Sequence, residues 1–254
     1  MNIALSVDWD FFFPNIDEWD YGHKENDFFI TDVWNLRASS TRDPMKHLLP
    51  KPGYKTFWKR LRQLNIIPPI CLVAESHLRG ADAVSLLEGK VDTLVVFDQH
   101  TDIYPQNLKY RLCQNWLLLL MRRYPTMSVI NVLPDFKEGD WIEKVQIAPE
   151  FIAEKLSDIA GRLTILQESE FFSMAQKLLG KHPNAMISFI CRSGAWTPPW
   201  ADDAFEEFLS DVEHMDFPEH APQPREFDRE GALRIQKDIT RLMPTLKHSN
   251  FFGV

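Results

Sequence analysis

Six side chains of the kinds that bind metal ions occur in three short segments of the chain. They are Asp8, Asp10, His77, Asp98, His100 and Asp102. Side chains of an extended chain alternate sides with a period of two residues. Asp8 and Asp10 therefore point the same way, and the run Asp98-Gln99-His100-Thr101-Asp102 offers three ligands to one point in space.

Four carboxylates that converge in a crevice of low dielectric repel one another, and their pKa values rise. Two divalent cations would offset this charge, and the two imidazoles would complete the ligand sets. A donor set without thiolates suits Mn²⁺ best, with iron, cobalt and zinc as alternatives. Two cations about 3.5–4 Å apart would lower the pKa of a bridging water and supply hydroxide near neutral pH. We expect His100 and Asp102 to act in catalysis as well as in metal binding.

Each segment also has a simpler interpretation. An Asp-x-Asp pair after a strand is often a turn or a helix cap, and a single histidine such as His77 is often a core or surface residue. The metal site is the better interpretation because one predicted crevice accounts for all three segments together.

The elements that must position these residues are three apolar runs, at residues 3–7, 66–74 and 91–97. Each run reads as a buried strand and ends just before one of the three segments. In an open parallel sheet, ligands bind beyond the carboxyl ends of the strands. The three runs therefore deliver their polar residues to one edge of a sheet.

The rest of the pattern alternates strands with helices, which predicts an α/β fold: a three-layer sandwich with a mostly parallel central sheet. We expect one domain over residues 1–254. The expected helices are residues 54–64, 80–87, 113–123, 150–160, 170–179, 201–212 and 229–242. Further strands are expected at residues 127–132, 162–166 and 185–191, and loops at 11–50 and 217–224.

Composition narrows the class of partner. The net charge of -8 argues against broad nucleic-acid binding, which needs a basic surface. Three widely spaced cysteines without a Cys-x-x-Cys pair favour a reducing compartment. The N-terminal residues lack a signal-peptide pattern, and the apolar run 116–121 is too short to span a bilayer. We expect a cytoplasmic protein that acts on a small molecule, with neither nucleic acid nor membrane as partner.

The three segments resemble motifs of the ureohydrolase family, which includes arginase and agmatinase. Residues 98–102 resemble the family's D-A-H-x-D motif, residues 6–10 its S-x-D-x-D motif, and His77 the histidine of its G-G-D-H motif. The resemblance implies the arginase/deacetylase fold and a homo-oligomer. It also implies that Asp8 and Asp98 bridge two metals, with His77 and Asp102 completing one and His100 and Asp10 the other.

The chain also departs from the family pattern. Its S-x-D-x-D motif comes first in the chain rather than late, which suggests a permuted connectivity, and Gln99 replaces a small residue. The D-x-D-F-F form and the pair Asn115-Trp116 resemble a less characterised branch of arginase-fold proteins.

Other residues are candidates for the substrate pocket. Arg192 follows another predicted strand and could clamp a carboxylate or phosphate, or form an ion pair with Asp202 or Asp203. Trp196 and Trp200 could form an aromatic wall or simply pack.

Four further residues have open roles. His23 and Glu25 are candidates for a proton shuttle or belong to a solvated loop. Glu75 either supports His77 or is a surface charge, and Cys191 is either a nucleophile or an inert buried thiol.

The leading functional hypothesis is a binuclear hydrolase in which a metal-bridging hydroxide attacks a guanidinium or amide carbon, other than that of a peptide bond. One alternative is a phosphatase of the haloacid-dehalogenase type, with Asp8 as nucleophile, Asp10 as acid and Asp202-Asp203 as the later acidic pair. Another is a non-catalytic, metal-binding regulatory protein. The number of metal ions bound per chain distinguishes a ureohydrolase-type enzyme, which holds two ions, from a deacetylase-type enzyme of the same fold, which holds one.

Overall fold

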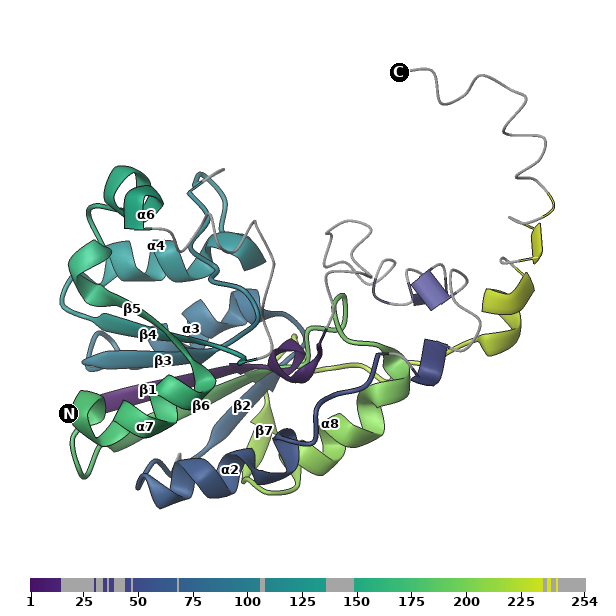
Figure 1. Cartoon of the computed structure of the whole chain (residues 1–254), viewed down its shortest axis with the longest axis horizontal. Coiled ribbons are helices and arrows are strands. Elements are labelled where there is room, and N and C mark those ends of the chain that lie inside the picture. Colours follow the sequence, from purple (N-terminus) through teal and green to yellow (C-terminus); the bar gives the residue numbers. More distant parts are fainter. Residues whose placement is uncertain are drawn as a thin grey trace.

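The central strand of the protein, β1, carries the first candidate ligands at its end (Figure 1). In the computed structural model it belongs to a seven-stranded sheet with the order β5-β4-β3-β1-β6-β2-β7, in which every pairing is parallel. The structure describes residues 1–14, 30, 34–35, 37–38, 44–46, 48–67, 69–105, 108–135, 149–234, 237–238 and 241.

The strands are β1 (Asn2–Asp8), β2 (Cys71–Ala74), β3 (Thr93–Phe97), β4 (Ser128–Leu133), β5 (Leu163–Gln167), β6 (Asn184–Cys191) and β7 (His214–Asp216). The α-helices are α2 (Tyr54–Gln63), α3 (Gly80–Ser85), α4 (Trp116–Arg123), α6 (Pro149–Lys155), α7 (Glu168–Leu179) and α8 (Asp202–Leu209). Short 3₁₀ turns are η1 (Trp9–Phe12), η3 (Pro44–Lys46), η4 (His77–Arg79), η5 (Cys113–Asn115), η6 (Ala160–Arg162) and η7 (Pro199–Ala201).

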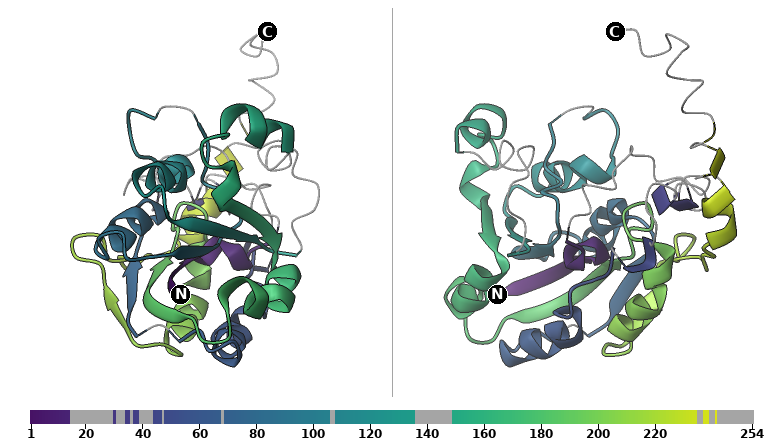
Figure 2. Two further views of the ribbon diagram at one scale, coloured as in Figure 1. Left: turned by 90° about the vertical axis from the view of Figure 1, so that its left-hand side faces the viewer. Right: turned by 45° about the vertical axis from the view of Figure 1, so that its right-hand side comes forward.

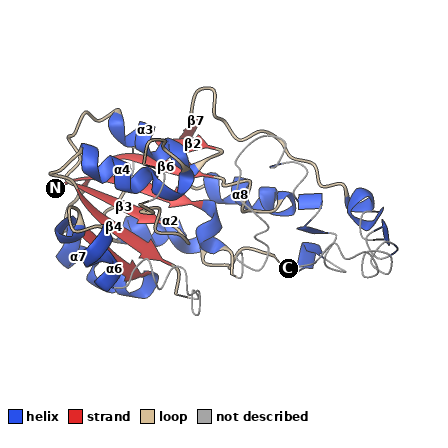
Figure 3. Cartoon of the chain, turned by 90° about the horizontal axis from the view of Figure 1, so that it is seen from above, coloured by secondary structure: helices blue, strands red, loops and turns tan. Residues whose placement is uncertain are grey.

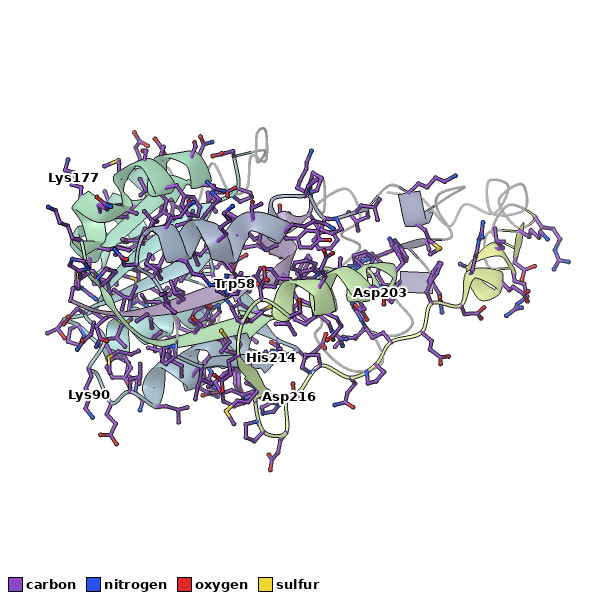
Figure 4. All side chains as sticks on the ribbon, turned by 90° about the horizontal axis from the view of Figure 1, so that it is seen from below. Trp58, Lys90, Lys177, Asp203, His214 and Asp216 are labelled. Carbon is purple, nitrogen blue, oxygen red and sulfur yellow. The ribbon has the colours of Figure 1, made fainter. Side chains whose placement is uncertain are left out.

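Helices cover both faces of the sheet, so the predicted three-layer α/β sandwich is confirmed. Figure 3 looks onto the face that carries α3 and α4, and Figure 4 onto the face of α2 and α8. Alternate residues of β1 supply the two cores: Ile3, Leu5 and Val7 pack with α2, α7 and α8, whereas Ala4 packs with α3 and α4. A strand buried on both faces explains why its sequence is continuously apolar.

All strands point the same way, so their carboxyl ends lie together at the end of the sheet opposite the N-terminus (Figures 1 and 2). β3, β1, β6 and β2 are consecutive neighbours in the sheet. The segments that follow these four strands therefore emerge side by side, as the sequence predicts for three of them.

The differences from the predicted elements have local causes. β2 begins at Cys71 rather than at residue 66, because the prolines at positions 68 and 69 lack the N–H that a central strand donates. The predicted helix 113–123 begins as η5 before α4, and α6 ends at Lys155 instead of residue 160. The described residues of the range 229–242 are helical, as expected.

The edge strand β7 was not predicted. Its three residues are all exposed, so they show neither an apolar run nor alternation. It forms because Cys71 of β2 aligns with His214 and offers its free edge. Among the described residues, we find no helix with the length and apolar character needed to span a bilayer.

Candidate metal centre

The six predicted ligands meet at the carboxyl edge of the sheet. Asp8 is the last residue of β1, His77 follows β2 by three positions, and Asp98 directly follows β3. Asp8, Asp10, His77, Asp98 and Asp102 are buried, whereas His100 is partly exposed. The residues lie in two groups, each with a histidine at its centre.

The first group surrounds the Nδ1 atom of His77. This atom lies 2.8 Å from Asp98 Oδ2, 3.2 Å from Asp8 Oδ2 and 3.3 Å from Asp102 Oδ2. Asp8, His77 and Asp98 each offer an atom within 4.8 Å of the others, close enough to share one cation.

The second group surrounds the Nδ1 atom of His100. It lies 3.2 Å from Asp10 Oδ2 and 3.4 Å from Asp98 Oδ1. Asp98 therefore presents Oδ2 to one histidine and Oδ1 to the other. A carboxylate placed in this way can bridge two cations.

Three buried atoms of the two groups make no hydrogen bond of proper geometry in the described part of the chain, although each lies within 3.2 Å of another ligand atom: Asp10 Oδ2, His77 Nδ1 and Asp98 Oδ2. A buried polar atom without a partner is costly, and proteins rarely leave one unsatisfied. All three belong to the two groups and face other ligand atoms. Cations within the groups would satisfy all three, so the residues fit a metal centre.

The electrostatics of the cluster agree with this conclusion. Burial raises the pKa of Asp10 well above its usual value, and Asp8 and Asp98 raise it further. Burial, helped by Asp98, also raises the pKa of Asp102 to about 7. Burial alone would lower the pKa of His77, but its aspartate neighbours raise it well above the ordinary value. Asp10, Asp102 and His77 therefore hold protons that bound cations could replace.

Asp98 differs from the other carboxylates. Burial would raise its pKa, but His77 and His100 lower it below the ordinary value. Asp98, which faces both histidines, thus keeps its negative charge more readily than Asp10 or Asp102. This is the property required of a bridging ligand.

The candidate ligands do not converge by alternating along an extended chain, as their spacing suggests. Asp10 lies in the 3₁₀ turn η1, whose first N–H groups need an acceptor, and Asp8 Oδ1 accepts the N–H of Asp10 at 3.0 Å. Asp102 has a positive φ of 49°. Asp8 is thus a turn cap, as its simpler interpretation proposed, and a candidate ligand through its other oxygen.

Aromatic packing holds the turn after β1. The Trp9 ring contacts those of Phe12, Phe205 and Phe208 with centroids 5.2–5.4 Å apart. The side chain of Gln99 donates to the carbonyl of Asp10 at 2.8 Å, which ties this turn to the segment after β3. Trp9 and Gln99, which lie between the candidate ligands in the sequence, therefore hold the two segments in place.

Three side chains that are not candidate ligands themselves orient the ligands through hydrogen bonds. Ser6 Oγ lies 2.7 Å from His77 Nε2, which leaves Nδ1 to face the carboxylates. The Trp116 indole donates to Asp102, and Ser193 Oγ donates to Asp8 Oδ2 at 2.6 Å. Such contacts fix the direction of ligand side chains and raise their affinity for metals.

Trp196, one of the predicted substrate residues, lies at the exposed side of the second group. The His100 side chain is 24% exposed, and its ring centroid is 5.2 Å from that of Trp196. Trp200 has a packing role, with its ring against Trp34 and Phe227 and its N–H donated to the carbonyl of Leu48. The structure thus brings only the first of the two tryptophans to the centre.

Arg192, the other predicted substrate residue, forms the ion pair that its alternative interpretation proposed. Its guanidinium donates to Asp202 at 3.4 Å and to Glu75 at 2.9 Å, whereas Asp203 is exposed on α8. Its role in substrate binding stays a prediction. Glu75 is not a surface charge, because only 17% of its side chain is exposed.

The remaining candidates are Cys191, His23 and Glu25. Cys191 is buried, with its Sγ 3.2 Å from Ser193 Oγ. His23 and Glu25 lie outside the described residues.

A cavity of about 520 Å³, which the sequence does not predict, lies beside the first group. It is lined by segments that follow β2, β6 and β7, among them Glu75, Arg79, Arg192, His220 and Arg225. Arg225 and His220 carry no motif and lie far along the chain in or near a predicted loop. Only the pairing of β7 with β2 brings them here.

Gly194 makes the closest approach in this region. Its N–H donates to Glu75 Oε1 at 2.8 Å, and a Cβ at this position would lie 1.9 Å from the same oxygen. We expect Gly194→Ala to lower the free energy of unfolding by about 1–3 kcal/mol through overpacking. Urea denaturation measures this, with Gly161→Ala as the control, since a Cβ there meets nothing within 4 Å. Equal stability of the two variants would contradict the prediction.

Comparison of the chain with protein-family models gives no match, and comparison with curated proteins gives none either.

Proposed function

We propose that the chain is a binuclear metal-dependent hydrolase that cleaves a carbon–nitrogen bond at a guanidinium or amide carbon. The observation that carries this proposal is the position of Asp98 between His77 and His100, with one carboxylate oxygen toward each. The two groups share this carboxylate, and two cations bound on either side of it would account for both groups together. The proposed substrate is a small molecule, and the proposed location is the cytoplasm.

The donor set favours manganese, because carboxylates and imidazoles without thiolates suit it best; iron, cobalt or zinc would also fit. Asp8, His77, Asp98 and Asp102 would hold one ion, and Asp10, Asp98 and His100 the other. Bound there, two divalent cations supply Lewis acidity and lower the pKa of water toward neutrality.

The protein's own residues do the rest. His100 and Trp196 are proposed to face the substrate, since the His100 side chain is the most exposed of the six candidate ligands and the Trp196 ring lies against it. Asp102, whose pKa burial raises to about 7, can hold a proton in the metal-free chain at Oδ1, because its Oδ2 accepts the Trp116 indole N–H. The buried surroundings of the other carboxylates keep water out and strengthen every electrostatic interaction with the reacting group.

A guanidinium substrate is favoured over an acylated amine. The deacetylase type needs only one ion, whereas here Asp10 and His100 complete a second group. The phosphatase alternative is weaker, because both oxygens of Asp8, its required nucleophile, accept hydrogen bonds from Asp10 and Ser193.

The direct test of function is a screen for released urea or amine over guanidines and acyl-amines, with and without Mn²⁺. The expected result is manganese-dependent release of urea from at least one guanidine. Phosphate release without urea or amine release would favour the phosphatase. Full manganese binding without any turnover would favour a regulatory protein.

Trp196→Ala is expected to raise KM about tenfold while the number of bound metals stays unchanged, because the lost ring contacts substrate rather than metal. Steady-state kinetics and metal analysis measure the two effects. Trp196→Phe is the control, since it keeps an aromatic ring beside His100. An unchanged KM in Trp196→Ala would remove this residue from the substrate site.

A further inference from the structure

Two arginines and two carboxylates form a buried ion-pair network behind the candidate metal centre. Arg192 donates to Glu75 at 2.9 Å and to Asp202 at 3.4 Å, and Arg225 donates to Asp202 at 3.1 Å. The arginine side chains are only 5% and 3% exposed. Glu75 follows β2, Arg192 follows β6 and Asp202 begins α8, so the network joins three separate elements.

The network holds the loop that follows β6. Glu75 Oε1 accepts the N–H of Gly194 at 2.8 Å, and Arg225 donates to the carbonyl oxygens of Gly194 and Thr197 at 2.8 and 2.7 Å. Groups of opposite charge thus clamp Gly194 from both sides, and no Cβ would fit there without displacing Glu75. The backbone on either side has little freedom.

Ser193, the residue before Gly194, has a positive φ of 51°. Serine rarely adopts this conformation, which is maintained only where the surroundings determine it. The result is that Ser193 Oγ lies 2.6 Å from Asp8 Oδ2, the oxygen that faces His77. Asp8 Oδ1 is already fixed by the N–H of Asp10, so both carboxylate oxygens are held.

From this chain of contacts we infer that Ser193 is a positioning residue for Asp8, and that the Glu75–Arg192–Asp202–Arg225 network sets the backbone of Ser193. The inference rests on the proposed metal centre. Its physical basis is preorganisation: a carboxylate that is already aimed loses less freedom when it binds a cation. Removal of a supporting contact to a metal ligand typically lowers metal affinity about 10–100-fold.

The first test compares Ser193→Ala with Ser193→Gly in the full chain. Both variants lack the hydroxyl, so both should bind Mn²⁺ about 10–100-fold more weakly by calorimetric titration. Their melting temperatures should differ, because glycine adopts a positive φ without strain and alanine does not. Equal losses of metal affinity at different stabilities would separate positioning from folding. Wild-type affinity in either variant would overturn the role of Ser193.

The second test is a double-mutant cycle with Asp202→Asn, which weakens the network far from the ligands. It should lower Mn²⁺ affinity several-fold in the wild-type background and have no further effect in Ser193→Ala, because both changes act through one contact. Asp203→Asn is the matched control, a neighbouring exposed aspartate of α8 (Figure 4).

If the losses of Mn²⁺ affinity in the Asp202→Asn and Ser193→Ala variants add up in the double variant, the link between the network and Ser193 is overturned. An electron paramagnetic resonance spectrum of the bound manganese would show whether the two ions remain coupled in each variant. Wild-type protein that binds no manganese would overturn the metal centre itself, so the two failures are distinguishable.

Discussion

Asp98→Ala is expected to lose both metal ions and all measurable turnover. Asp98 faces both histidines, so its removal takes a ligand from each group at once. The remaining carboxylates of each group would bind a cation at least about 100-fold more weakly, since removing a direct ligand costs more than the 10–100-fold typical of a supporting residue. Metal analysis after dialysis measures the number of ions per chain.

Asp10→Ala is the graded comparison for this variant. Asp10 belongs only to the group around His100, so one ion should remain beside His77. Asp203→Ala, a change of an exposed aspartate on α8, should retain two. Two ions bound by the Asp98→Ala variant would show that this carboxylate does not bridge the groups.

Manganese affinity is expected to fall about 100-fold or more between pH 8 and pH 6. In the metal-free chain the pKa of Asp102 is raised to about 7 by burial and Asp98, and that of His77 is raised well above its usual value by its aspartate neighbours. Both groups hold a proton at pH 6 that a cation must displace. Each displaced proton weakens binding up to about tenfold per pH unit below the pKa of its group.

The direction of this pH dependence follows from the two raised pKa values, because protons that occupy the ligands are lost as the pH rises. Affinity should rise with pH and level off once these two groups and Asp10, whose pKa burial also raises, have lost their protons. Titrations with Mn²⁺ at fixed ionic strength over this range measure it, and proton release on binding, in two buffers of different ionisation enthalpy, counts the displaced protons. Affinity independent of pH would exclude His77 and Asp102 as ligands.

The candidate ligands could be found from the sequence because each follows a strand with a strong apolar signal. Asp8 and Asp98 directly end the buried strands β1 and β3, and a parallel sheet places such residues at one edge. The same logic predicted the layers, since β1 is apolar on both faces. The local sequence pattern is thus sufficient to predict the position of a residue that directly follows a buried strand.

The supporting contacts could not be found in this way. Ser193 lies 185 positions from Asp8 in the chain, and their contact depends on β6 being the neighbour of β1. The burial of Glu75 likewise depends on Arg192, 117 positions away. Ser193 carries no motif. Arg192 could be selected because it follows a strand, and its pair with Asp202 was an expected alternative, but no local pattern indicates its contact with Glu75.

The strand β7 could not be predicted from the sequence either. Its exposed residues, such as Met215, give no hydrophobic pattern, and the strand exists only because β2 offers an edge. Yet β7 and the segment after it bring His220 and Arg225 to the cavity beside the centre. The wall of this cavity that follows β7 is therefore also the part that sequence patterns describe least.

The most direct test of the binuclear centre is anomalous diffraction from crystals of the chain soaked with manganese. We expect two anomalous peaks, one beside His77 and one beside His100, with an oxygen of Asp98 bonded to each. A single peak would reduce the centre to one ion and remove the argument for a guanidinium substrate. Peaks elsewhere, or none at these residues at a concentration that saturates binding in solution, would contradict the metal centre altogether.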